Sequence, residues 1–458
     1  MSKDMRTAFL LFAAAVLLRV AAAVPGFLNP ELLMRPDSAS YLAPAYSLAE
    51  RFSYSDGAVP TALRVPLYPA ILSIGLLADG MTPGGFCILL NILLSSFAVP
   101  LIWFACREYG LSPKHSLFGT AVYLLTPTPV ALAPMFLSDG LFGTLAALEL
   151  LFLIRLFRRG GRGWLYASAA IGGAGVLIRP LNLLWILPCL FVSLFAGKER
   201  FRIRLLDCAV SMAIFLAVFT PWILRNHAVG SGWRIDAVSA DSLKHNAAIT
   251  ESRASGRPAQ YYRDFYDAHF NAVFESDPDR FRSADSRLTY QEAYLSAILK
   301  KHPFEYLRGF YHPVNFVPDV PGLLENLGLS RGGRGTLDVI VNRGLFAGIR
   351  YYFSGNWFLP VVLAPLCLFL FAAYLSGIYG FFVMLLERKW LLPLLFLPMG
   401  LYYMTVTGPV AYPRFFLPAL PYLCVLSATG LQLLRDRGRK EDEKQSKGHS
   451  EYDNNPRI

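Results

Sequence analysis

Charged residues are scarce in this sequence. Only 16% of its 458 residues are Asp, Glu, Lys or Arg, whereas 54% are hydrophobic. A soluble globular protein has roughly 25% charged residues, so this chain has too few of them to cover a water-facing surface of its size. The short alternating segments that are typical of membrane β-barrels are also missing. The composition therefore favours a polytopic helical membrane protein.

Cysteine patterns are equally sparse. The six cysteines lie within or at the ends of apolar runs and form no CxxC pair or metal-ligand spacing. Free cysteine behaves there as a small hydrophobe, so neither a disulfide framework nor a zinc site is indicated. The net charge of +11 invites a nucleic-acid partner. The basic residues lie in short clusters between apolar runs, however, where membrane orientation explains them, and no nucleic-acid partner is expected.

Apolar runs long enough to cross a hydrocarbon core recur along the chain. They predict an all-α polytopic membrane protein with about ten transmembrane helices of roughly 20 residues each. The predicted spans are 8–24, 86–106, 116–133, 141–157, 164–178, 181–196, 205–224, 357–386, 390–406 and 415–434. The first is interpreted as an uncleaved helix rather than a signal peptide, with Arg19 near its outer end reaching the interface by snorkelling.

The short basic clusters set the orientation. With the N-terminus inside, they all fall on the cytoplasmic side, as the positive-inside rule requires. A first outer loop at 25–83, with interfacial helices, and a long outer loop at 225–355 then lie outside. The long loop contains an amphipathic stretch at 290–310. The charged tail at 435–458 lacks apolar periodicity and is predicted to be disordered in the cytoplasm, which leaves 1–434 as the membrane domain.

Carboxylates and arginines gather at the outer face in this topology. They come from distant segments: Asp37, Arg64, Asp139, Arg179, Arg225, Asp236, Asp241 and Arg414. A structural interpretation is open for each of them. Asp37 precedes a helical run and would serve as its N-cap, and an arginine at a membrane face serves as an interface anchor. Their number on one side favours a shared site.

Such a set suits the transfer of a sugar from a lipid phosphate. Arginines contact an anionic phosphate through bidentate hydrogen bonds. The departing lipid phosphate is already a stable anion and needs no general acid, unlike the leaving group of glycoside hydrolysis. One base must still take the proton of the attacking hydroxyl. Asp37 is the candidate base and Arg64 the candidate phosphate anchor, while a second carboxylate would orient the acceptor or help to hold a divalent cation.

Several stretches, taken in order, resemble one family of membrane enzymes. They are Asp37 with Tyr41, 63–69 with Arg64 and Tyr68, 138–142 with Asp139, 175–180 with Arg179, 220–226 with Arg225, and 413–418 with Arg414. Together they resemble membrane glycosyltransferases of the GT-C class, specifically the protein-mannosyltransferase and aminoarabinose-transferase-like group.

The resemblance implies inverting transfer from a polyprenyl- or dolichyl-phosphate sugar to an envelope lipid, glycan or protein. The reaction would take place at the periplasmic face of a bacterial inner membrane. Asp37 would act as base, Asp139 as a second essential carboxylate and Arg64 as a contact to the donor phosphate. The further candidates for substrate binding are Tyr41, Tyr68, Arg179, Arg225 and Arg414. Ser38 follows Asp37 where many members have Glu, which leaves metal handling open.

Two other functions remain open. A lipid-linked saccharide flippase or transporter would show pseudo-symmetric halves and charged or broken helices near the middle of the membrane; no repeat is visible. A glycan polymerase or ligase would also place arginines outside, but it would act on diphosphate-linked chains.

Overall fold

The computed structural model describes residues 2–197, 199–310, 316–329, 336–353, 355, 358–410 and 412–453. The described chain is almost entirely helical, as predicted. Its strands, β1 (Ser55–Asp56) and β2 (Val59–Pro60), form a small antiparallel hairpin in the first outer loop, with Ser55 opposite Pro60.

Helices occupy each of the predicted spans. They are α1 (Lys3–Leu28), α4 (Gly85–Ser96) with α5 (Ala98–Tyr109), α6 (Pro113–Leu125) with α7 (Pro127–Leu132), α8 (Asp139–Arg159), α9 (Arg162–Val176), η2 (Pro180–Trp185) with α10 (Ile186–Ala196), α11 (Phe201–Ala228), α19 (Phe358–Leu386), α20 (Leu391–Thr405), and η4 (Pro413–Ala419) with α21 (Leu420–Asp453). Among the described residues, six of these segments are long and apolar enough to cross a membrane, and the others are shorter or interrupted. Residue 357, where one span was predicted to begin, lies outside the described residues.

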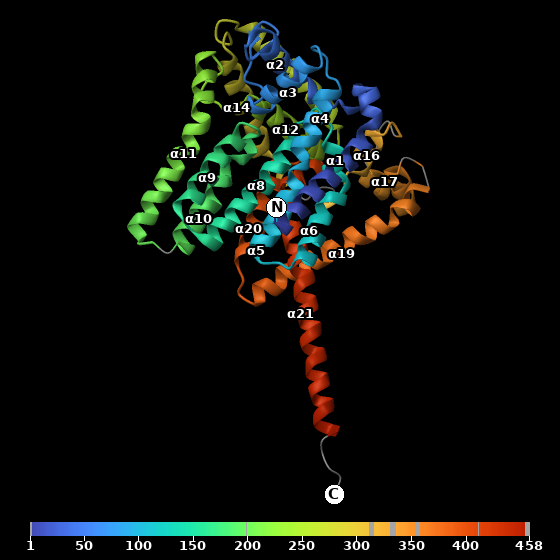
Figure 1. Cartoon of the computed structure of the whole chain (residues 1–458). Coiled ribbons are helices and arrows are strands. Elements are labelled where there is room, and N and C mark those ends of the chain that lie inside the picture. Colours follow the sequence, from blue (N-terminus) through green and yellow to red (C-terminus); the bar gives the residue numbers. More distant parts are fainter. Residues whose placement is uncertain are drawn as a thin grey trace.

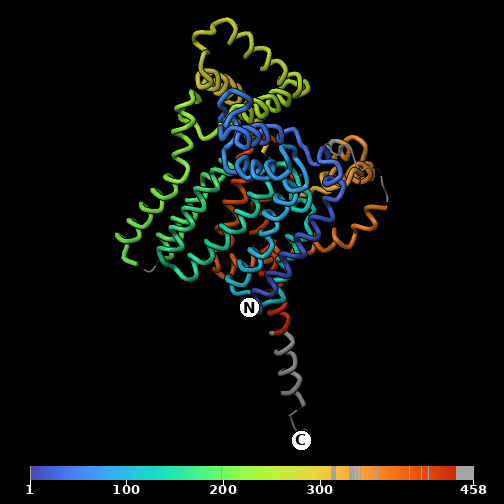
Figure 2. Tube along the Cα trace, turned by 45° about the horizontal axis from the view of Figure 1, so that its top comes forward, coloured from blue at the N-terminus to red at the C-terminus, as the bar shows by residue number. Residues whose placement is uncertain are grey.

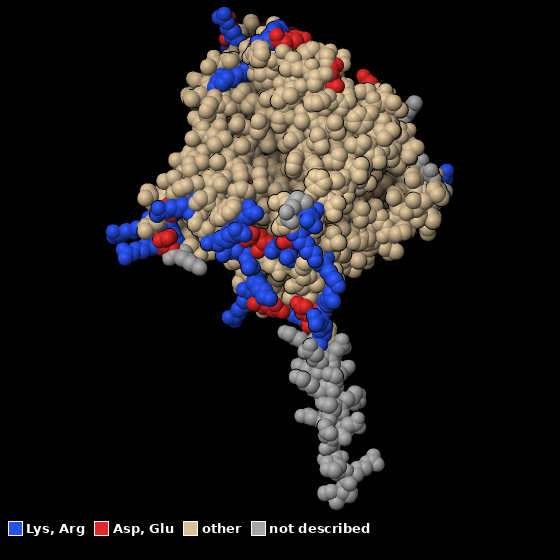
Figure 3. Space-filling view, in the orientation of Figure 1, with Lys and Arg blue, Asp and Glu red and all other residues tan. Residues whose placement is uncertain are grey.

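The two ends of the bundle differ in charge. Figure 1 shows the first outer loop, with α2 and α3, at the top of the bundle and α21 leaving it at the bottom. The N-terminus lies at the same end as the departing α21 in Figure 2. Lysine and arginine side chains gather around this lower end in Figure 3, beneath a broad belt of uncharged surface. This distribution agrees with the positive-inside orientation expected from the sequence.

The first outer loop is folded into short helices. They are η1 (Pro30–Leu33), α2 (Ser38–Arg51) and α3 (Leu67–Ala78). At 1.5 Å per residue, the 12 residues of α3 extend about 18 Å, too short to cross a bilayer. Its inner face is buried through Tyr68, Leu72 and Leu76. The prediction of helices lying at the interface is therefore supported.

The long outer loop forms a helical cap. Its helices are α12 (Val238–Ser255), α13 (Ala259–Ser276), α14 (Ala284–Lys301), α15 (Pro303–Arg308), α16 (Val320–Asn326), α17 (Thr336–Arg343) and α18 (Leu345–Tyr352). The first three share a small core that includes Tyr266, Phe270 and Leu295. The predicted amphipathic stretch is thus helical, but it breaks into α14 and α15, because Pro303 begins a new helix.

Arg19 does not reach the interface, contrary to the snorkelling prediction. Its residue is 1% exposed, and its three guanidinium nitrogens have no hydrogen-bond partner among the described residues. The cause is the length of α1, which continues to Leu28. Nine further residues place the helix end about 13 Å beyond Arg19, so the side chain is enclosed by neighbouring helices.

The charged tail is helical where the sequence predicted disorder. Helix α21 continues to Asp453, well into the segment predicted to be disordered. This segment has no glycine or proline between residues 439 and 447 and is rich in Arg, Lys, Glu and Gln, which are good helix formers. Arg437 also lies 3.3 Å from Glu387 of the segment after α19, which ties the beginning of the tail to the bundle.

Two glycines allow α19 and α21 to cross closely. A Cβ atom at Gly430 would lie 1.9 Å from the carbonyl oxygen of Ser376, and one at Gly380 would lie 2.8 Å from Cα of Gly430. We expect Gly430→Ala to lower the free energy of unfolding by about 1–3 kcal/mol, because the added methyl group meets backbone that cannot move aside. Thermal unfolding in detergent measures the loss. Gly438→Ala is the control on the same helix, since nothing lies within 4 Å there, and an equal effect of both changes would contradict the packing argument.

Candidate active site

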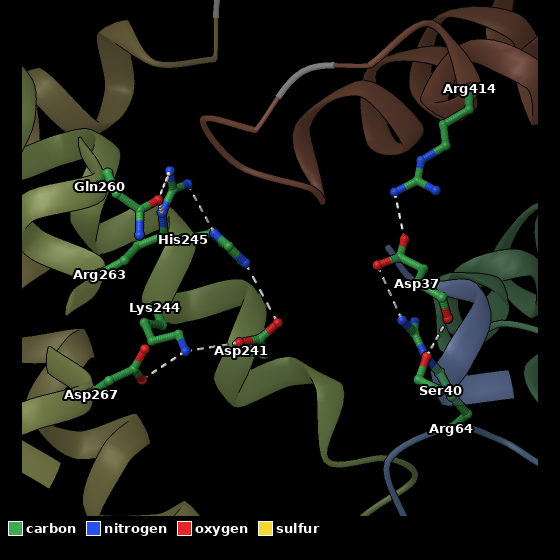
Figure 4. Close-up of polar contacts among 10 residues, drawn as sticks. All are labelled: Asp37, Ser40, Arg64, Asp241, Lys244, His245, Gln260, Arg263, Asp267 and Arg414. Carbon is green, nitrogen blue, oxygen red and sulfur yellow. Dashed lines mark hydrogen bonds and ion pairs between the residues drawn. The ribbon is translucent and has the colours of Figure 1, made fainter. Parts of the chain in front are cut away.

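Asp37 stands immediately before α2, but its carboxylate does not cap that helix. The structure shows no cap hydrogen bond from its side chain. Instead, Oδ2 accepts a hydrogen bond from Nη2 of Arg414 at 2.7 Å, and Oδ1 lies 3.5 Å from Nη2 of Arg64. Figure 4 shows the two guanidinium groups approaching the carboxylate from opposite sides. The side chain of Asp37 is still 37% exposed, so its carboxylate is open to the outer surface.

The two arginines keep Asp37 ionised. Partial burial raises the pKa of this carboxyl, but the guanidinium groups of Arg414 and Arg64 outweigh that effect and hold the pKa below its usual value. Asp37 is therefore a carboxylate at neutral pH, placed beside two cations.

Arg64 is held in place by neighbours from α2. Its Nε donates a hydrogen bond to Oγ of Ser40 at 2.8 Å, and its guanidinium carbon lies 4.4 Å from the centre of the Tyr41 ring. Ser40 lies three residues after Asp37 and so occupies the same face of the helix. Asp37 and the first turn of α2 therefore supply a carboxylate, a hydrogen-bond acceptor and an aromatic surface to a single arginine.

Arg414 comes from the other end of the chain, 377 residues after Asp37. It stands at the start of η4, where Pro413 occupies the first turn. Its guanidinium lies 5.2 Å and 5.5 Å from the ring centres of Tyr412 and Phe415. The short 3-10 turn before α21 thus places the guanidinium group of Arg414 next to Asp37 in the first outer loop.

A second ion pair is more deeply buried than the carboxylate of Asp37. Asp139 is the first residue of α8, and one of its carboxylate oxygens accepts a hydrogen bond from Nη1 of Arg179. The side chains are 2% and 15% exposed, so this is a buried ion pair. The position at the start of α8 also favours the negative charge of Asp139 through the helix dipole.

The two pairs belong to one cluster. The hydroxyl of Tyr41 lies 3.0 Å from Oγ of Ser138, the residue before Asp139. Arg414 interacts electrostatically with both Asp139 and Asp37. Acid and guanidinium groups from four distant segments therefore converge at the outer end of the bundle.

Tyr68 contacts the cluster through Tyr41, whereas Arg225 contacts the first outer loop. Tyr68 is 1% exposed, and its ring meets the ring of Tyr41 edge-on at 5.2 Å. Arg225 donates hydrogen bonds to the carbonyl oxygens of Thr61 and Tyr54 in the first outer loop. These contacts favour roles in bracing the loop, whereas the sequence predicted both residues as substrate contacts.

The other two predicted carboxylates lie in the long outer loop. Asp236 is 8% exposed and lies near Arg64, and burial raises the pKa of its carboxyl to about 6. Asp241 belongs to a separate polar group on the cap, on the left of Figure 4, where it pairs with Lys244 at 3.3 Å. Lys244 also lies 2.9 Å from Asp267 and so joins α12 to α13. This second group therefore links two helices of the cap and is separate from the cluster around Asp37.

A divalent cation has no ready set of ligands in the described part of the chain. No group of three or more His, Cys, Asp and Glu side chains lies close enough there to share a metal ion. Asp37 instead has two guanidinium partners, which supply the positive charge that a cation would bring. The described residues therefore form no ready-made metal site, and the divalent cation stays a prediction.

Sequence reasoning did not identify Ser40 or Ser138 as members of the site. Both are common residue types in unremarkable surroundings. Only their spacing carried a signal, since Ser40 follows Asp37 by one helical turn and Ser138 precedes Asp139 directly.

One protein family matches part of the chain. Residues 64–224 match the family described as dolichyl-phosphate-mannose-protein mannosyltransferase. The matched segment contains Arg64, Asp139 and Arg179 but neither Asp37 nor Arg414. No curated protein sequence matches the chain significantly.

The fold is similar to that of the oligosaccharyltransferase of Archaeoglobus fulgidus. Its apo crystal structure shares 13% identity at a TM-score of 0.52, with 96% of this chain and 52% of that chain covered. The archaeal enzyme AglB from the same organism, in complex with an inhibitory peptide and a dolichol-phosphate, shares 11% identity at a TM-score of 0.51, with 97% and 52% covered. ArnT from Cupriavidus metallidurans shares 14% identity at a TM-score of 0.39, with 94% and 77% covered. The chain thus spans about half the length of the oligosaccharyltransferase chains that it matches.

The helical fold is thus similar to that of the archaeal oligosaccharyltransferase, and it carries a cluster of acids and arginines at one end of the bundle. Residues 64–224 carry the pattern of the protein-mannosyltransferase family. The resemblance noted from the sequence is thereby confirmed.

Proposed function

We propose that the chain transfers a sugar from a polyprenyl-phosphate donor to an envelope lipid, glycan or protein, with Asp37 as the catalytic base. The reaction takes place at the extracytoplasmic face, in our proposal the periplasmic face of a bacterial inner membrane. The observation that carries the proposal is the partly exposed carboxylate of Asp37 between Arg64 and Arg414 at the outer end of the bundle.

In this proposal, Arg64 and Arg414 bind the donor phosphate. The phosphate is an anion that competes with Asp37 for the N–H groups of Arg64 and Arg414. As these groups turn toward the phosphate, they stabilise Asp37 less, and its carboxylate becomes a stronger base. Donor binding therefore prepares the base for its step. The complex of AglB with a dolichol-phosphate supports the idea that this fold accommodates a lipid phosphate.

The chemical step is a single displacement. Asp37 takes the proton from the acceptor hydroxyl, whose oxygen forms a bond to C1 of the sugar from the face opposite the phosphate. The bond between C1 and the phosphate oxygen breaks, and the lipid phosphate leaves as an anion. The configuration at C1 is therefore inverted, and no acid is required.

Asp139 is assigned a positioning role rather than direct contact with the substrate. Its carboxylate is 2% exposed and engaged by Arg179, whose own electrostatic influence extends to Asp37. The buried pair fixes the start of α8 and, through Ser138, the hydroxyl of Tyr41. Tyr41 in turn supports Arg64.

A donor comparison tests the function. Purified protein in lipid vesicles is given a labelled monosaccharide on polyprenyl phosphate, or a saccharide on polyprenyl diphosphate, and envelope extracts serve as acceptors. We expect transfer from the monophosphate donor only. Turnover of the diphosphate donor alone would indicate a polymerase or ligase, and movement of lipid across the bilayer without transfer would indicate a flippase. Mass spectrometry of envelope glycoconjugates with and without the gene then identifies the sugar and the acceptor, as the loss of one sugar mass.

Replacing Arg414 should shift the pH dependence. Arg414 is one of the cations that lower the pKa of Asp37, so Arg414→Gln raises that pKa. A base works only when deprotonated, and activity falls as the pH drops through its pKa. We therefore expect the acid limb of kcat/KM to move to higher pH in Arg414→Gln, on top of a general loss from weaker donor binding.

The control for this pH profile is Arg282→Gln, an exposed arginine of the cap. Its acid limb should coincide with that of the wild type. An unshifted limb in Arg414→Gln would mean that another group titrates.

A further inference from the structure

A hollow lies at the cytoplasmic end of the bundle, at the opposite end of α8 from Asp139. Its volume is about 400 Å³. It is lined by the end of α5 and the turn after it, the end of α8, the turn between α19 and α20, and α21 near Gln432. Four helices that cross the membrane therefore meet around it.

The rim of this hollow is strongly basic. Arg158, Arg388 and Lys389 line it, and among the described residues no carboxylate does. The nearest acid in sequence, Glu387, is already shared by Lys389 at 2.9 Å and Arg437 at 3.3 Å. Among the described residues, Arg388 has no ion-pair partner, and Nη1 of Arg158 donates to the carbonyl oxygen of Tyr109 at 3.0 Å. An excess of positive charge thus faces the hollow.

The backbone at Arg388 has an unfavourable conformation for a residue with a side chain. Its φ is +58°, a left-handed conformation that few residues other than glycine adopt. The turn is a helix end in which the N–H of Lys389 donates to the carbonyl oxygen of Met384 at 2.8 Å. Glycine is the usual residue at such a position. Arg388 thus occupies a turn position at which glycine is the usual residue.

The walls of the hollow are apolar and aromatic. Phe157, Trp390 and Leu433 line it together with the basic rim. Phe157 and Trp390 are 42% and 48% exposed, and tryptophan prefers the boundary between headgroups and acyl chains. A cationic rim beside apolar walls, at the cytoplasmic boundary, matches an anionic headgroup carrying an acyl chain.

We propose that this hollow binds the headgroup of an anionic phospholipid of the inner leaflet. Arg388 and Arg158 contact the phosphate, which suits the planar guanidinium group, and Trp390 lies against the first part of the acyl chain. Basic pockets between transmembrane helices on the cytoplasmic side favour such lipids. This inference does not depend on the proposed glycosyl transfer.

The test is lipid-dependent thermal stability of the full chain. Protein stripped of lipid in neutral detergent is titrated with phosphatidylglycerol, with phosphatidylcholine, or with inorganic phosphate. We expect the melting temperature to rise with phosphatidylglycerol only. Arg388→Gln should weaken the apparent affinity roughly fivefold, the effect of one basic residue at a membrane surface, and Arg388→Gln with Arg158→Gln should weaken it further.

Arg202→Gln is the matched control, because Arg202 is a cytoplasmic arginine on α11 outside the hollow. It should respond as the wild type does. An equal response to phosphatidylcholine, an equal response to inorganic phosphate, or an unchanged titration of Arg388→Gln would overturn the proposal. Should the double variant fail to fold, the single variant and the lipid comparison decide the question.

Discussion

Asp37→Asn should reduce sugar transfer by about 10²–10⁴-fold, the usual contribution of a general base. The amide cannot accept the proton of the acceptor hydroxyl, while its shape and its contacts with the surrounding residues are largely kept. Donor binding should persist, since Arg64 and Arg414 remain and no longer have a carboxylate to pair with. The measurement is kcat for transfer from a polyprenyl-phosphate sugar, with donor binding followed separately.

This substitution separates the two roles that the sequence left open for Asp37. Asn is as good an N-cap as Asp, so a capping residue would tolerate the change with little loss of stability or activity. The structure already shows no cap hydrogen bond from this side chain. A large loss of transfer in a stably folded variant would therefore support the catalytic role, and near wild-type transfer would remove Asp37 from the mechanism.

The control for this experiment is Asp56→Asn. Asp56 is an exposed carboxylate of the hairpin in the same outer loop. Removing it lowers the negative charge of the loop equally, but it should leave transfer unchanged. If both variants lost activity alike, the effect would come from the overall field of the loop and not from a base at Asp37.

Much of the fold could be predicted because its signals are local. Apolar runs and basic clusters indicate spans and orientation without any knowledge of partners, and every predicted span is helical. Asp37 and Arg64 were predicted to share a face because both lie in the first outer loop, and they do lie 3.5 Å apart.

The remaining features depend on contacts between distant segments, which the sequence does not reveal. Arg414 was predicted at the outer face, but its hydrogen bond to Asp37 joins segments 377 residues apart. The burial of Arg19 depends in the same way on the neighbours of α1. Tyr68 and Arg225 have residue types suited to binding a sugar phosphate, but their buried or backbone-directed contacts were not predictable from type and spacing.

Asp139→Asn should destabilise the fold more than any other single substitution proposed for this chain. Removing one partner of a buried ion pair typically costs about 3–5 kcal/mol, because the other charge is left without compensation in a poorly solvated place. Asp139 is 2% exposed and its partner Arg179 is 15% exposed, so solvent does little to relieve Arg179. The loss is measured by thermal unfolding in detergent, together with the yield of folded protein.

The double variant Asp139→Asn with Arg179→Gln shows whether Asp139 acts through its partner. With both charges removed, no uncompensated ion remains, and most of the lost stability should return. Sugar transfer should stay low in the double variant if the positive charge of Arg179 helps to stabilise the carboxylate of Asp37. A different pattern, in which Asp139→Asn unfolds at the wild-type temperature yet fails to transfer sugar, would mean that Asp139 contacts the reacting groups directly and that the positioning role assigned to it is wrong.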